Sequence, residues 1–448
     1  HFSLATSSLA CDQSDWSAYC EVFAMMPQRT LSPTAAPISF WDLIRAASSF
    51  WGGDNHRVRL IQELKAKFSA REVFLVSSGK AALTVILKAL AASSGGRRVI
   101  IPAYTCFSVP SAVVKAGMEV VLCDVDPETL DFNFAELEGL INEDVLCVVP
   151  THLFGRPADV DRVKRLCEGK GIVVVEDAAQ AMGGQSGGRL LGTLGDVAFF
   201  SLGRGKNLTC GTGGIILTRS LSIAEQIKAE YATLPEAPRG EVVRNWLEMV
   251  MMRFFIHPLL YWIPAGLPFL RLGETTFYTD FPMCRMDEVR AHQLQGWERR
   301  LDRANQQRAA RAGWLIDGLD LHRRGIRPIT GKEAIYLRLP VMLRDRETKE
   351  AVCRQSRVEG AGVSQNYPAT IQEIPELAGR LASRKCSGAQ DVVDRLVTLP
   401  THQFVKERDR LKIDRVLGSQ GCRSIPTVSG DTKTADHASD HRPALSGK

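Results

Sequence analysis

The sequence predicts an α/β protein in which a mostly parallel central sheet forms a large domain and a smaller α+β domain follows it. Between about residues 70 and 220, short β-rich runs alternate with helix-length segments, which is typical of parallel strands joined by helical crossovers. The runs are largely unbroken by polar residues, as expected for strands that helices cover on both faces. After about residue 280 the chain changes to a long amphipathic segment and several shorter elements.

The strands of the central sheet can be placed in chain order. They are expected at residues 73–76, 98–101, 119–122, 145–149, 172–175, 197–200 and 214–217. Helices at residues 81–92 and 158–170 lie between the earlier strands, so those strands should pair in parallel. The last two strands are joined without an obvious helix. We therefore expect one edge strand to be antiparallel.

The second domain begins with a predicted helix over residues 286–319, because Leu294, Trp297, Leu301 and Leu315 share one helical face. Shorter elements follow, at 335–340 and, as a helix, at 406–417. The last residues are rich in Ser, Asp, Thr, His and Lys, and they cannot bury enough apolar surface to become ordered. We divide the chain into an N-terminal tail (1–30), a large domain (31–275), a small domain (276–420) and a disordered tail (421–448).

Composition excludes several classes of protein. The 448 residues carry 56 Lys plus Arg and 50 Asp plus Glu, a net charge of only +6, so no concentrated basic face for nucleic acid is expected. The 11 cysteines form no CxxC pair and no cluster at zinc spacing, which argues against a metal site. Several lie in apolar runs, where a free cysteine behaves as a small hydrophobic residue. A reducing cytoplasm fits this pattern best.

One apolar segment, residues 254–270, allows a membrane interpretation. It contains Pro258, Pro264 and Pro268, and it is shorter than the ~20 apolar residues that a spanning helix needs. A buried contact between domains or subunits is the favoured interpretation. Peripheral attachment to a membrane through Trp262 and its neighbours is the alternative.

The first loop that carries chemistry is residues 76–83 (VSSGKAAL), where a strand enters a Ser/Gly turn that opens a helix. Free N–H groups and the positive end of the helix dipole make such a start an anion site. Gly79 lets the backbone approach closely, and Lys80 adds charge. Ser78 in an ordinary helix cap is the competing interpretation.

The second loop is residues 173–180 (VVVEDAAQ), where an acidic pair ends an apolar strand. Ligands of open α/β sheets bind at the carboxyl ends of strands, and Asp177 placed there can pair with a protonated ring nitrogen. Asp177 as the cap of the next helix is an equally simple explanation of this motif.

The third loop is residues 195–214, in which Lys206 lies among glycines after a strand. Partial desolvation there lowers the pKa of an amine and makes it nucleophilic. A P-loop does not fit, because Phe200 stands at its first glycine and Asn207 at its magnesium-binding Ser or Thr. A dinucleotide fingerprint does not fit either, since Gly203 and Gly205 come late in the unit.

Together the loops offer an anion cradle, a strand-end Asp and a loop Lys, which are the three groups that pyridoxal phosphate requires. The chain resembles the DegT/DnrJ/EryC1/StrS aminotransferases, fold type I pyridoxal-phosphate enzymes that act mostly on nucleotide-linked keto sugars. The resemblance is carried by the segments 78–83 (SGKAAL), 101–105 (IPAYT), 121–126 (VLCDVD), 152–155 (HLFG), 176–181 (EDAAQA), 200–214 (FSLGRGKNLTCGTGG), 285–288 (RMDE) and 399–402 (LPTH).

The resemblance implies a role for each matching residue. Lys206 is expected to bind the cofactor covalently and then to move the proton between substrate and cofactor. Asp177 is expected to keep the pyridine nitrogen protonated, with Gln180 near the ring hydroxyl. The phosphate is expected to be held by Ser201 and the Ser78–Gly79–Lys80 turn, through the amides of Gly79 and Lys80.

Five positions depart from the family's pattern. Lys80 stands where the family usually has Thr, which still suits phosphate. Cys106 stands where an aromatic residue often stacks on the cofactor ring, a role that could pass to Tyr104 or Phe107, and Gly203 stands where many members have His. Thr212 replaces a Glu, and Met283 lies near the position of an Asn that reaches the partner subunit.

The resemblance implies a cytoplasmic homodimer that transfers an amino group from glutamate or glutamine to a nucleotide-linked keto sugar, for polysaccharide or natural-product biosynthesis. Two alternatives stay open, a regulatory or scaffolding homologue without activity and a sugar dehydratase. The family's dehydratases have His in place of Lys206, which disfavours the second.

Overall fold

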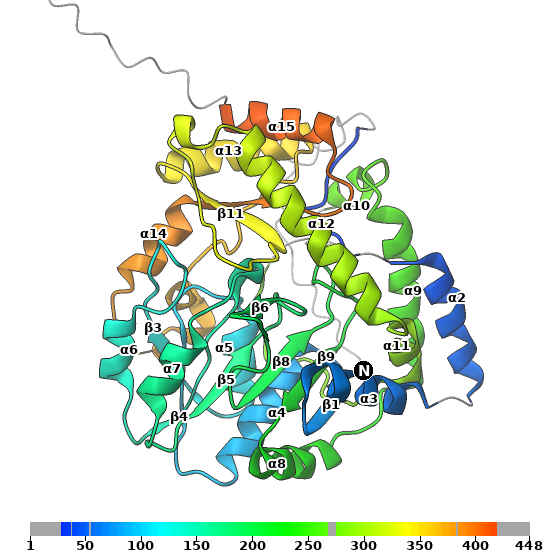
Figure 1. The fold of residues 1–448 in the computed structure, drawn as a ribbon, viewed down its shortest axis with the longest axis vertical. Helices are drawn as coiled ribbons and strands as arrows, with labels where there is room; N and C mark the ends of the chain where they lie inside the picture. Colours follow the sequence, from blue (N-terminus) through cyan, green and yellow to red (C-terminus); the bar gives the residue numbers. More distant parts are fainter. Residues whose placement is uncertain (1–27, 37, 53–54, 268–274, 382–383, 419–448) are drawn as a thin grey trace, which may run out of the picture.

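The computed structural model of the chain describes residues 28–36, 38–52, 55–267, 275–381 and 384–418. Figure 1 shows a large sheet flanked by helices, with a smaller sheet and two further helices stacked above it. The tail predicted at 421–448, and residues 1–27 of the tail predicted at 1–30, lie outside the described residues.

The central sheet has seven strands in the order β1-β9-β8-β5-β4-β2-β3. β2, β3, β4, β5 and β8 pair in parallel, as predicted. Each predicted strand is present, with the bounds β1 (Glu72–Val76), β2 (Arg98–Pro102), β3 (Glu119–Cys123), β4 (Val145–Val148), β5 (Val173–Asp177), β8 (Val197–Ser201) and β9 (Gly214–Thr218).

The expectation of an antiparallel edge strand is wrong in its position. β9 is antiparallel to both β8 and β1, so the reversed strand lies one place inside the sheet and β1 forms the edge. The connection between β8 and β9 does reverse the chain. On its other side β9 pairs with β1, with Glu72 opposite Thr218. Because these two residues lie far apart in the sequence, no local pattern predicts this pairing.

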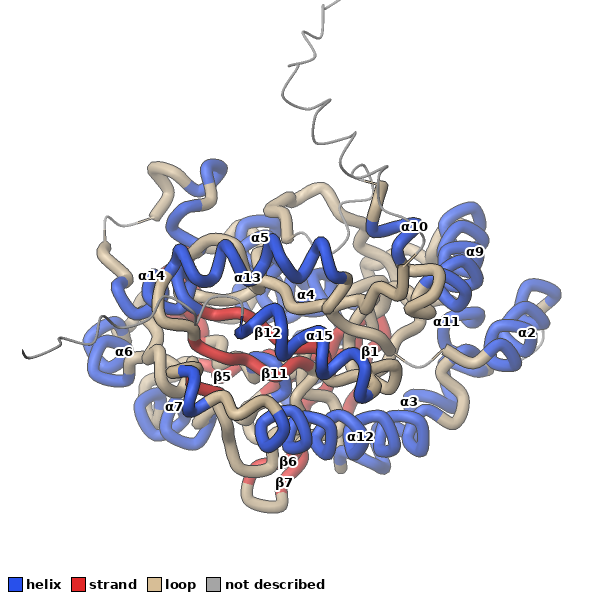
Figure 2. The backbone as a smooth tube through the Cα atoms, turned by 90° about the horizontal axis from the view of Figure 1, so that it is seen from above, coloured by secondary structure: helices blue, strands red, loops and turns tan. Residues whose placement is uncertain are grey.

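Helices cover both faces of this sheet, as Figure 2 shows from above. One face shares an apolar core with α4 (Gly79–Ala91), α5 (Ser108–Lys115) and α8 (Leu221–Ala232). The other face packs against four helices, namely α3 (His56–Phe68), α6 (Phe134–Leu140), α7 (Val160–Cys167) and the start of α12 (Trp297–Gly318).

The C-terminal part builds a three-stranded antiparallel sheet in the order β10-β11-β12. Its bounds are β10 (Arg327–Pro328), β11 (Arg338–Met342) and β12 (Leu396–Pro400). Three helices pack around it, α13 (Arg346–Glu359), α15 (Glu407–Gly418) and the end of α12, and their apolar residues form a separate core. A further helix, α14 (Ser387–Arg395), packs instead against the core of the large sheet.

The predicted single helix over residues 286–319 is wrong. It is divided into α11 (Glu288–Gln293) and α12, because Gly296 between them has a left-handed φ of 68°, which a continuous helix cannot accommodate. The predicted apolar face is nevertheless buried, and Leu294, Trp297 and Leu301 pack against the large sheet.

Residues 28–36 form an extended segment, which we call the N-terminal strap. Arg29 makes an ion pair of 2.8 Å with Asp409 of α15. The N–H groups of Thr30 and Leu31 donate to the carbonyls of Pro258 and Gly360, at 2.8 and 2.9 Å. The strap therefore joins the C-terminal helix to the segment between the two domains.

The strap also contacts a buried histidine whose protonation should govern stability. His402 is only 2% exposed, and its Nε2–H donates to the carbonyl of Ser32 at 2.8 Å. Burial lowers the pKa of His402 to about 4, and the charges of Arg308 and Arg311 act in the same direction.

We expect the free energy of unfolding to fall as the pH drops from about 6.5 toward 4, because the unfolded chain takes up a proton at His402 that the folded chain refuses. Above pH 7 both states are neutral at this residue and the effect vanishes. Between about pH 4 and 6.5, His402 should change the free energy of unfolding by about 1.4 kcal/mol per pH unit. Urea unfolding across this range should show the His402→Gln variant losing that slope, whereas the exposed His322→Gln control keeps it. Parallel profiles for wild type and His402→Gln would contradict the assignment.

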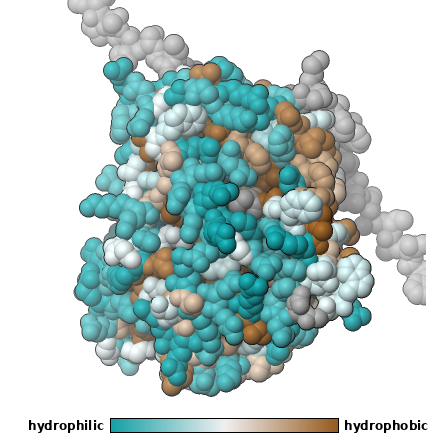
Figure 3. All heavy atoms as spheres, turned by 45° about the vertical axis from the view of Figure 1, so that its right-hand side comes forward, coloured by the Kyte–Doolittle hydropathy of each residue, from teal (hydrophilic) through white to brown (hydrophobic). Residues whose placement is uncertain are grey.

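Helices α2 (Phe40–Ser48) and α9 (Arg239–Phe255) lie side by side on one flank of the molecule. Both expose large apolar side chains, and those of α9 recur at helical spacing. Figure 3 turns this flank forward and shows hydrophobic side chains gathered on it. We call this surface the α2/α9 apolar face, and it comprises Phe40, Trp41, Ile44, Val243, Leu247, Met251 and Phe254.

The apolar segment from residue 254 continues this flank without forming a long helix. α9 ends at Phe255, and only the short α10 (Trp262–Ala265) follows before the described residues stop at 267. No helix within the described parts of the chain is long and apolar enough to cross a membrane.

Candidate active site

The three predicted loops meet at the carboxyl ends of β1, β5 and β8. β5 pairs with β8 so that Asp177 lies opposite Phe199, two residues before Ser201. Ser201 in turn lies opposite Gly214 of β9. The sheet thus brings together a helix start, a carboxylate and the loop that carries Lys206.

The helix start forms a tight cradle of backbone. Ser78 caps α4, and its Oγ accepts the N–H of Ala81 at 3.1 Å. A Cβ on Gly79 would lie 2.8 Å from the Cβ of Ser201, and a Cβ on Gly214 would lie 2.2 Å from the carbonyl oxygen of Ser78. The N–H groups of Gly79 and Lys80 at this start make no hydrogen bond within the described residues. Free amides beside the Ser201 hydroxyl, at the positive end of a helix, suit a phosphate group.

The side chain of Lys80 points elsewhere. Its amine lies 3.2 Å from the centre of the Tyr278 ring and 4.8 Å from that of Phe281, in cation–π contact. We therefore assign to the cradle only the backbone amide of Lys80.

The two carboxylates of the acidic pair at the end of β5 have different surroundings. Glu176 is fully buried and accepts hydrogen bonds from His152 at 2.8 Å and from the N–H groups of Gly192, Leu194 and Gly195. Burial alone would raise the pKa of Glu176, but these donors, His152 first, bring it below the ordinary value. Nδ1 of His152 accepts the N–H of Ala158 at 2.9 Å, so the proton lies on Nε2. Glu176 is thus a structural anchor.

Asp177 has the opposite character. It is 4% exposed, and a single N–H, that of Ala179 at 3.0 Å, donates to its carboxylate. Burial raises the pKa of Asp177, against the effects of that N–H and of the nearby Lys206 and His152. A buried carboxylate with so few donors suits a cationic partner such as a protonated ring nitrogen.

Gln180 is held by two partners, one of which the sequence did not indicate. Its Oε1 accepts the N–H of Phe154 at 3.1 Å, and its Nε2 donates to the hydroxyl of Tyr367 at 2.8 Å. The ring of Tyr367 packs against Tyr104, whose hydroxyl donates to the carbonyl of Asn366. Tyr367 comes from the C-terminal part, outside every motif that pointed to the site.

Lys206 lies half-buried in the loop between β8 and β9. Burial lowers the pKa of its amine; the neighbouring Cys106 and Asp177 oppose this shift and the guanidinium of Arg338 adds to it. Just before Lys206, Gly205 has a φ of 72°, and a Cβ there would lie 2.2 Å from Oγ1 of Thr34 in the N-terminal strap. The strap therefore covers the lysine loop directly.

Helix α12 holds the same loop from another side. Arg308 is 2% exposed and donates from Nη1 to the carbonyl of Asn207 at 3.3 Å, and from Nη2 to that of Ala35 at 3.1 Å. Asn305 accepts from Nδ2 of Asn207 at 3.1 Å. Burial lowers the pKa of Arg308 to about 10. Neither α12 residue was predicted from the sequence, where both look like polar positions of an amphipathic helix.

The positions that depart from the family's pattern have defined surroundings. Thr212 donates to the carbonyl of Ser77 at 2.9 Å and accepts from the buried Arg290 at 2.8 Å. Cys106 lies within electrostatic range of both Lys206 and Arg338. Of the two aromatic residues that could replace its ring, Tyr104 is buried against Tyr367.

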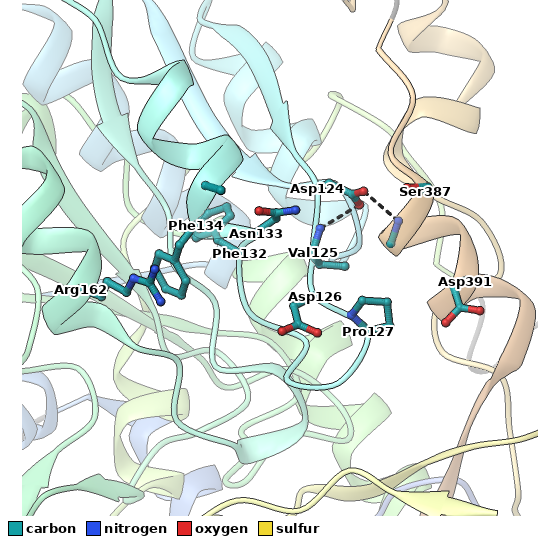
Figure 4. Close-up of a pocket in the computed structure, with 12 residues that line it drawn as sticks. Asp124, Val125, Asp126, Pro127, Phe132, Asn133, Phe134, Arg162, Ser387 and Asp391 are labelled. Carbon is teal, nitrogen blue, oxygen red and sulfur yellow. Dashed lines mark hydrogen bonds between the residues drawn. The ribbon is translucent and has the colours of Figure 1, made fainter.

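A separate cavity of about 620 Å³ lies between β3, α6 and α14, and Figure 4 shows its lining. Asp124 there accepts the N–H groups of Gly388 and Ala389, at 2.8 and 2.7 Å, and so fixes the start of α14. No predicted site residue lines this cavity. Among the described residues, no group of three or more His, Cys, Asp or Glu side chains could hold a metal ion.

A sequence profile of the DegT/DnrJ/EryC1/StrS aminotransferase family matches residues 45–245 and 275–417, which is most of the chain and includes all three loops of the site. The chain belongs to this family. The predicted family, fold class and pyridoxal phosphate cofactor are thereby confirmed. Residues 246–274, between the two matched parts, contain the end of α9 and α10.

Relatives of this aminotransferase-family chain differ in how much of it they match. The "Pleiotropic regulatory protein" of Geobacillus stearothermophilus is 32% identical over 188 residues, 42% of this chain and 50% of that protein. A UDP-N-acetyl-3-dehydro-alpha-D-glucosamine 3-aminotransferase of Acidithiobacillus ferrooxidans is 26% identical over 348 residues, 76% of this chain and 82% of that protein. The chain thus spans about half the length of the first relative.

Solved structures of the family share the fold. The aminotransferase TlmJ of Streptoalloteichus hindustanus superposes with a TM-score of 0.70 at 21% identity, covering 87% of this chain and 98% of that one.

The cradle makes a testable contribution to cofactor binding. We expect Gly79→Ala to raise the dissociation constant of pyridoxal phosphate at least about tenfold, which is about 1.4 kcal/mol, because the new Cβ would lie 2.8 Å from Ser201. Helix propensity acts the other way, since alanine is favoured over glycine in a helix by about 1 kcal/mol. Cofactor titration by fluorescence checks this. The matched control is Gly313→Ala in α12, where no atom lies within 4 Å of the added Cβ. Wild-type affinity in Gly79→Ala would refute the cradle.

Proposed function

We propose that this member of the family is a pyridoxal-phosphate-dependent aminotransferase that transfers an amino group from glutamate or glutamine to a keto sugar carried by a nucleotide. The observation that carries the proposal is Lys206, a lysine with a lowered pKa beside the buried Asp177 and the Gly79 cradle. The relative from Acidithiobacillus ferrooxidans, whose name is that of an enzyme acting on a keto sugar nucleotide, supports the substrate class. Polysaccharide or natural-product biosynthesis is the process in which such a product is used.

The chain's own residues divide the chemistry among them. Pyridoxal phosphate, when bound, supplies an electron-accepting ring that stabilises negative charge on a substrate carbon. The carboxylate of Asp177 holds a proton on the ring nitrogen, which keeps that ring electron-poor. The amine of Lys206, whose pKa burial lowers, takes the proton from the substrate carbon and returns it. Gln180, whose amide donates to the hydroxyl of Tyr367, would lie near the ring hydroxyl of the bound cofactor.

A half-reaction assay tests the proposal. Purified holoenzyme mixed with glutamate or glutamine is expected to convert the cofactor to its amine form and release a 2-oxo acid. A panel of nucleotide keto sugars, followed by mass spectrometry, should then yield an amino sugar. Failure to convert the cofactor with any amino acid would overturn the proposal.

Two other functions give different outcomes in the same assays. A dehydratase would release a deoxy keto sugar without net transfer of an amine. A regulatory or scaffolding protein, the alternative that the name of the Geobacillus relative raises, would bind the cofactor without either conversion. The presence of Lys206 disfavours the dehydratase, and the half-reaction assay separates the aminotransferase from a regulatory protein.

We further propose that the chain forms a homodimer through the α2/α9 apolar face. Leu247 and Met251 are 51% and 54% exposed, and an exposed apolar surface of this kind favours a contact between copies. Light scattering should show a dimer that Leu247→Glu with Met251→Glu converts to monomer. The control is Leu411→Glu, at an equally exposed leucine of α15. An unchanged dimer, or variants that instead lose binding to anionic lipid vesicles, would refute this and favour a membrane contact.

We place the protein in the cytoplasm. The cysteines of the described residues are free and most are buried, which suits a reducing compartment.

A further inference from the structure

Arg338 is the first residue of β11, and it lies within electrostatic range of Lys206 with unused hydrogen-bonding capacity. Its Nη1 donates to Oγ of Ser364 at 3.3 Å and to Oδ1 of Asn366 at 3.2 Å, and both acceptors are neutral. Within the described parts of the chain, no carboxylate lies within ion-pair distance of Arg338, and its Nε and Nη2 make no hydrogen bond.

The surroundings of Arg338 are those of the site. It lies within electrostatic range of Tyr367, Tyr261, Tyr104 and Cys106, and its charge acts on Lys206. Asn366, which Arg338 contacts, also accepts the hydroxyl of Tyr104, and the next residue, Tyr367, binds Gln180. A continuous set of contacts thus leads from Arg338 to the end of β5.

Two other arginines with little exposure have a carboxylate partner, since Arg290 pairs with Asp287 and Arg300 pairs with Asp42. Arg308 resembles Arg338, because among the described residues it makes no ion pair and donates to neutral oxygens. One nitrogen of each of these three arginines also makes no hydrogen bond there. Burial lowers the pKa of Arg338, which shows that removing its charge from water is unfavourable. A partly buried guanidinium without an anion costs stability unless a ligand supplies the negative charge.

We propose that Arg338 binds a carboxylate of the substrate and so determines which substrates react at Lys206. The proposal rests on the aminotransferase function above. A guanidinium presents a planar fork of N–H donors that matches a carboxylate through two parallel hydrogen bonds, and Nε and Nη2 of Arg338 form such a fork. The carboxylate of an amino acid is one bond from the carbon whose proton Lys206 moves, so its binding group must lie on the same side of the site. Arg338 meets this condition through its contact with Asn366, whose neighbour Tyr367 binds Gln180, and through its electrostatic effect on Lys206.

The carboxylate can come from the amino donor or from an acidic sugar, and kinetics separate these sources. If the donor supplies it, Arg338→Gln raises KM for glutamate about 10- to 100-fold and leaves KM for the keto sugar unchanged. Isoglutamine, which lacks the α-carboxylate, then reacts equally poorly with wild type and variant. If the sugar supplies it, only an acidic keto sugar loses affinity. The matched control is Arg344→Gln, an exposed arginine on the same strand's continuation that pairs with Asp345.

A binding measurement keeps this test separate from activity. Calorimetry with 2-oxoglutarate and with succinate should show binding to wild-type holoenzyme and to Arg344→Gln, and a loss of at least tenfold in Arg338→Gln. Arg338→Lys keeps the charge but loses the fork, so it should bind these dicarboxylates with intermediate affinity. This variant provides the test if Arg338→Gln does not fold.

The two proposals fail in different ways. Carboxylate affinity and KM values within twofold of wild type in both Arg338 variants would overturn the role of Arg338, even in an active aminotransferase. A wild type that transfers no amine would overturn the proposed function. Calorimetry would still show whether a carboxylate binds at Arg338.

Discussion

Replacing Lys206 with alanine is expected to lower the rate of amino transfer on the order of 10³-fold or more, because the variant loses both the amine that binds the cofactor and the base that moves the proton. The visible absorption band of covalently bound cofactor should disappear. Cofactor affinity should fall less steeply, since the Gly79 cradle and Asp177 are unchanged. Stopped-flow absorbance with glutamate measures the rate, and equilibrium dialysis measures the affinity.

The exposed Lys170 is the control for this change. Lys170→Ala removes an amine of the same kind in the turn after α7 and should leave both the absorption band and the rate unchanged. Added methylamine or ethylamine should partly restore the proton transfer in Lys206→Ala, because a free amine can occupy the space of the missing side chain. Wild-type turnover in Lys206→Ala would show that the amine acting in catalysis lies elsewhere.

The adjacent carboxylates Glu176 and Asp177 should give opposite results. Glu176→Ala is expected to lower the free energy of unfolding by about 3–5 kcal/mol, because it breaks a buried pair and leaves His152 and the N–H groups of residues 192–195 without an acceptor. Asp177→Asn should keep most of the stability but lower turnover about 10²-fold or more, since an amide cannot hold the charge of the ring nitrogen. Urea unfolding and half-reaction kinetics, applied to both variants, separate the two effects.

Glu143→Ala, at an exposed position before β4, is the control for stability and should unfold like wild type. If Asp177→Asn were the less stable variant and Glu176→Ala the less active one, the assignment of anchor and catalytic group would be reversed.

The parts of the site that follow local rules could be predicted from the sequence. A strand followed by a Ser/Gly turn, a carboxylate at a strand end and a lysine in a glycine-rich loop each carry a short-range signal. Because carboxyl ends of parallel strands meet at one edge of a sheet, the order of these loops also predicted that Gly79, Asp177 and Lys206 come together. The strands of the central sheet were predicted for the same reason.

The residues that come from the other half of the chain could not be predicted. Tyr367 reaches Gln180 because a segment of the C-terminal part packs against the core of the large sheet, and Arg338 begins a strand of the C-terminal sheet. Arg308 looks like an ordinary polar position of a helix. The charge of Lys80 was expected to assist its backbone amide in the cradle, yet its side chain lies over Tyr278, because an aromatic face close by competes with the cradle. The place of β9 inside the sheet likewise depends on a pairing between distant residues.

The N-terminal strap has a consequence for how the protein is made. Arg29 leaves the ribosome early but binds Asp409, which lies 380 residues later. Thr34 and Ala35 of the same strap contact the lysine loop and Arg308. The central sheet can form while synthesis continues, since domains fold as units from the N-terminal side. The lysine loop, however, acquires its final covering only once α15 has been synthesised. Competence to hold the cofactor is therefore expected to arise after translation ends, as the last step of folding.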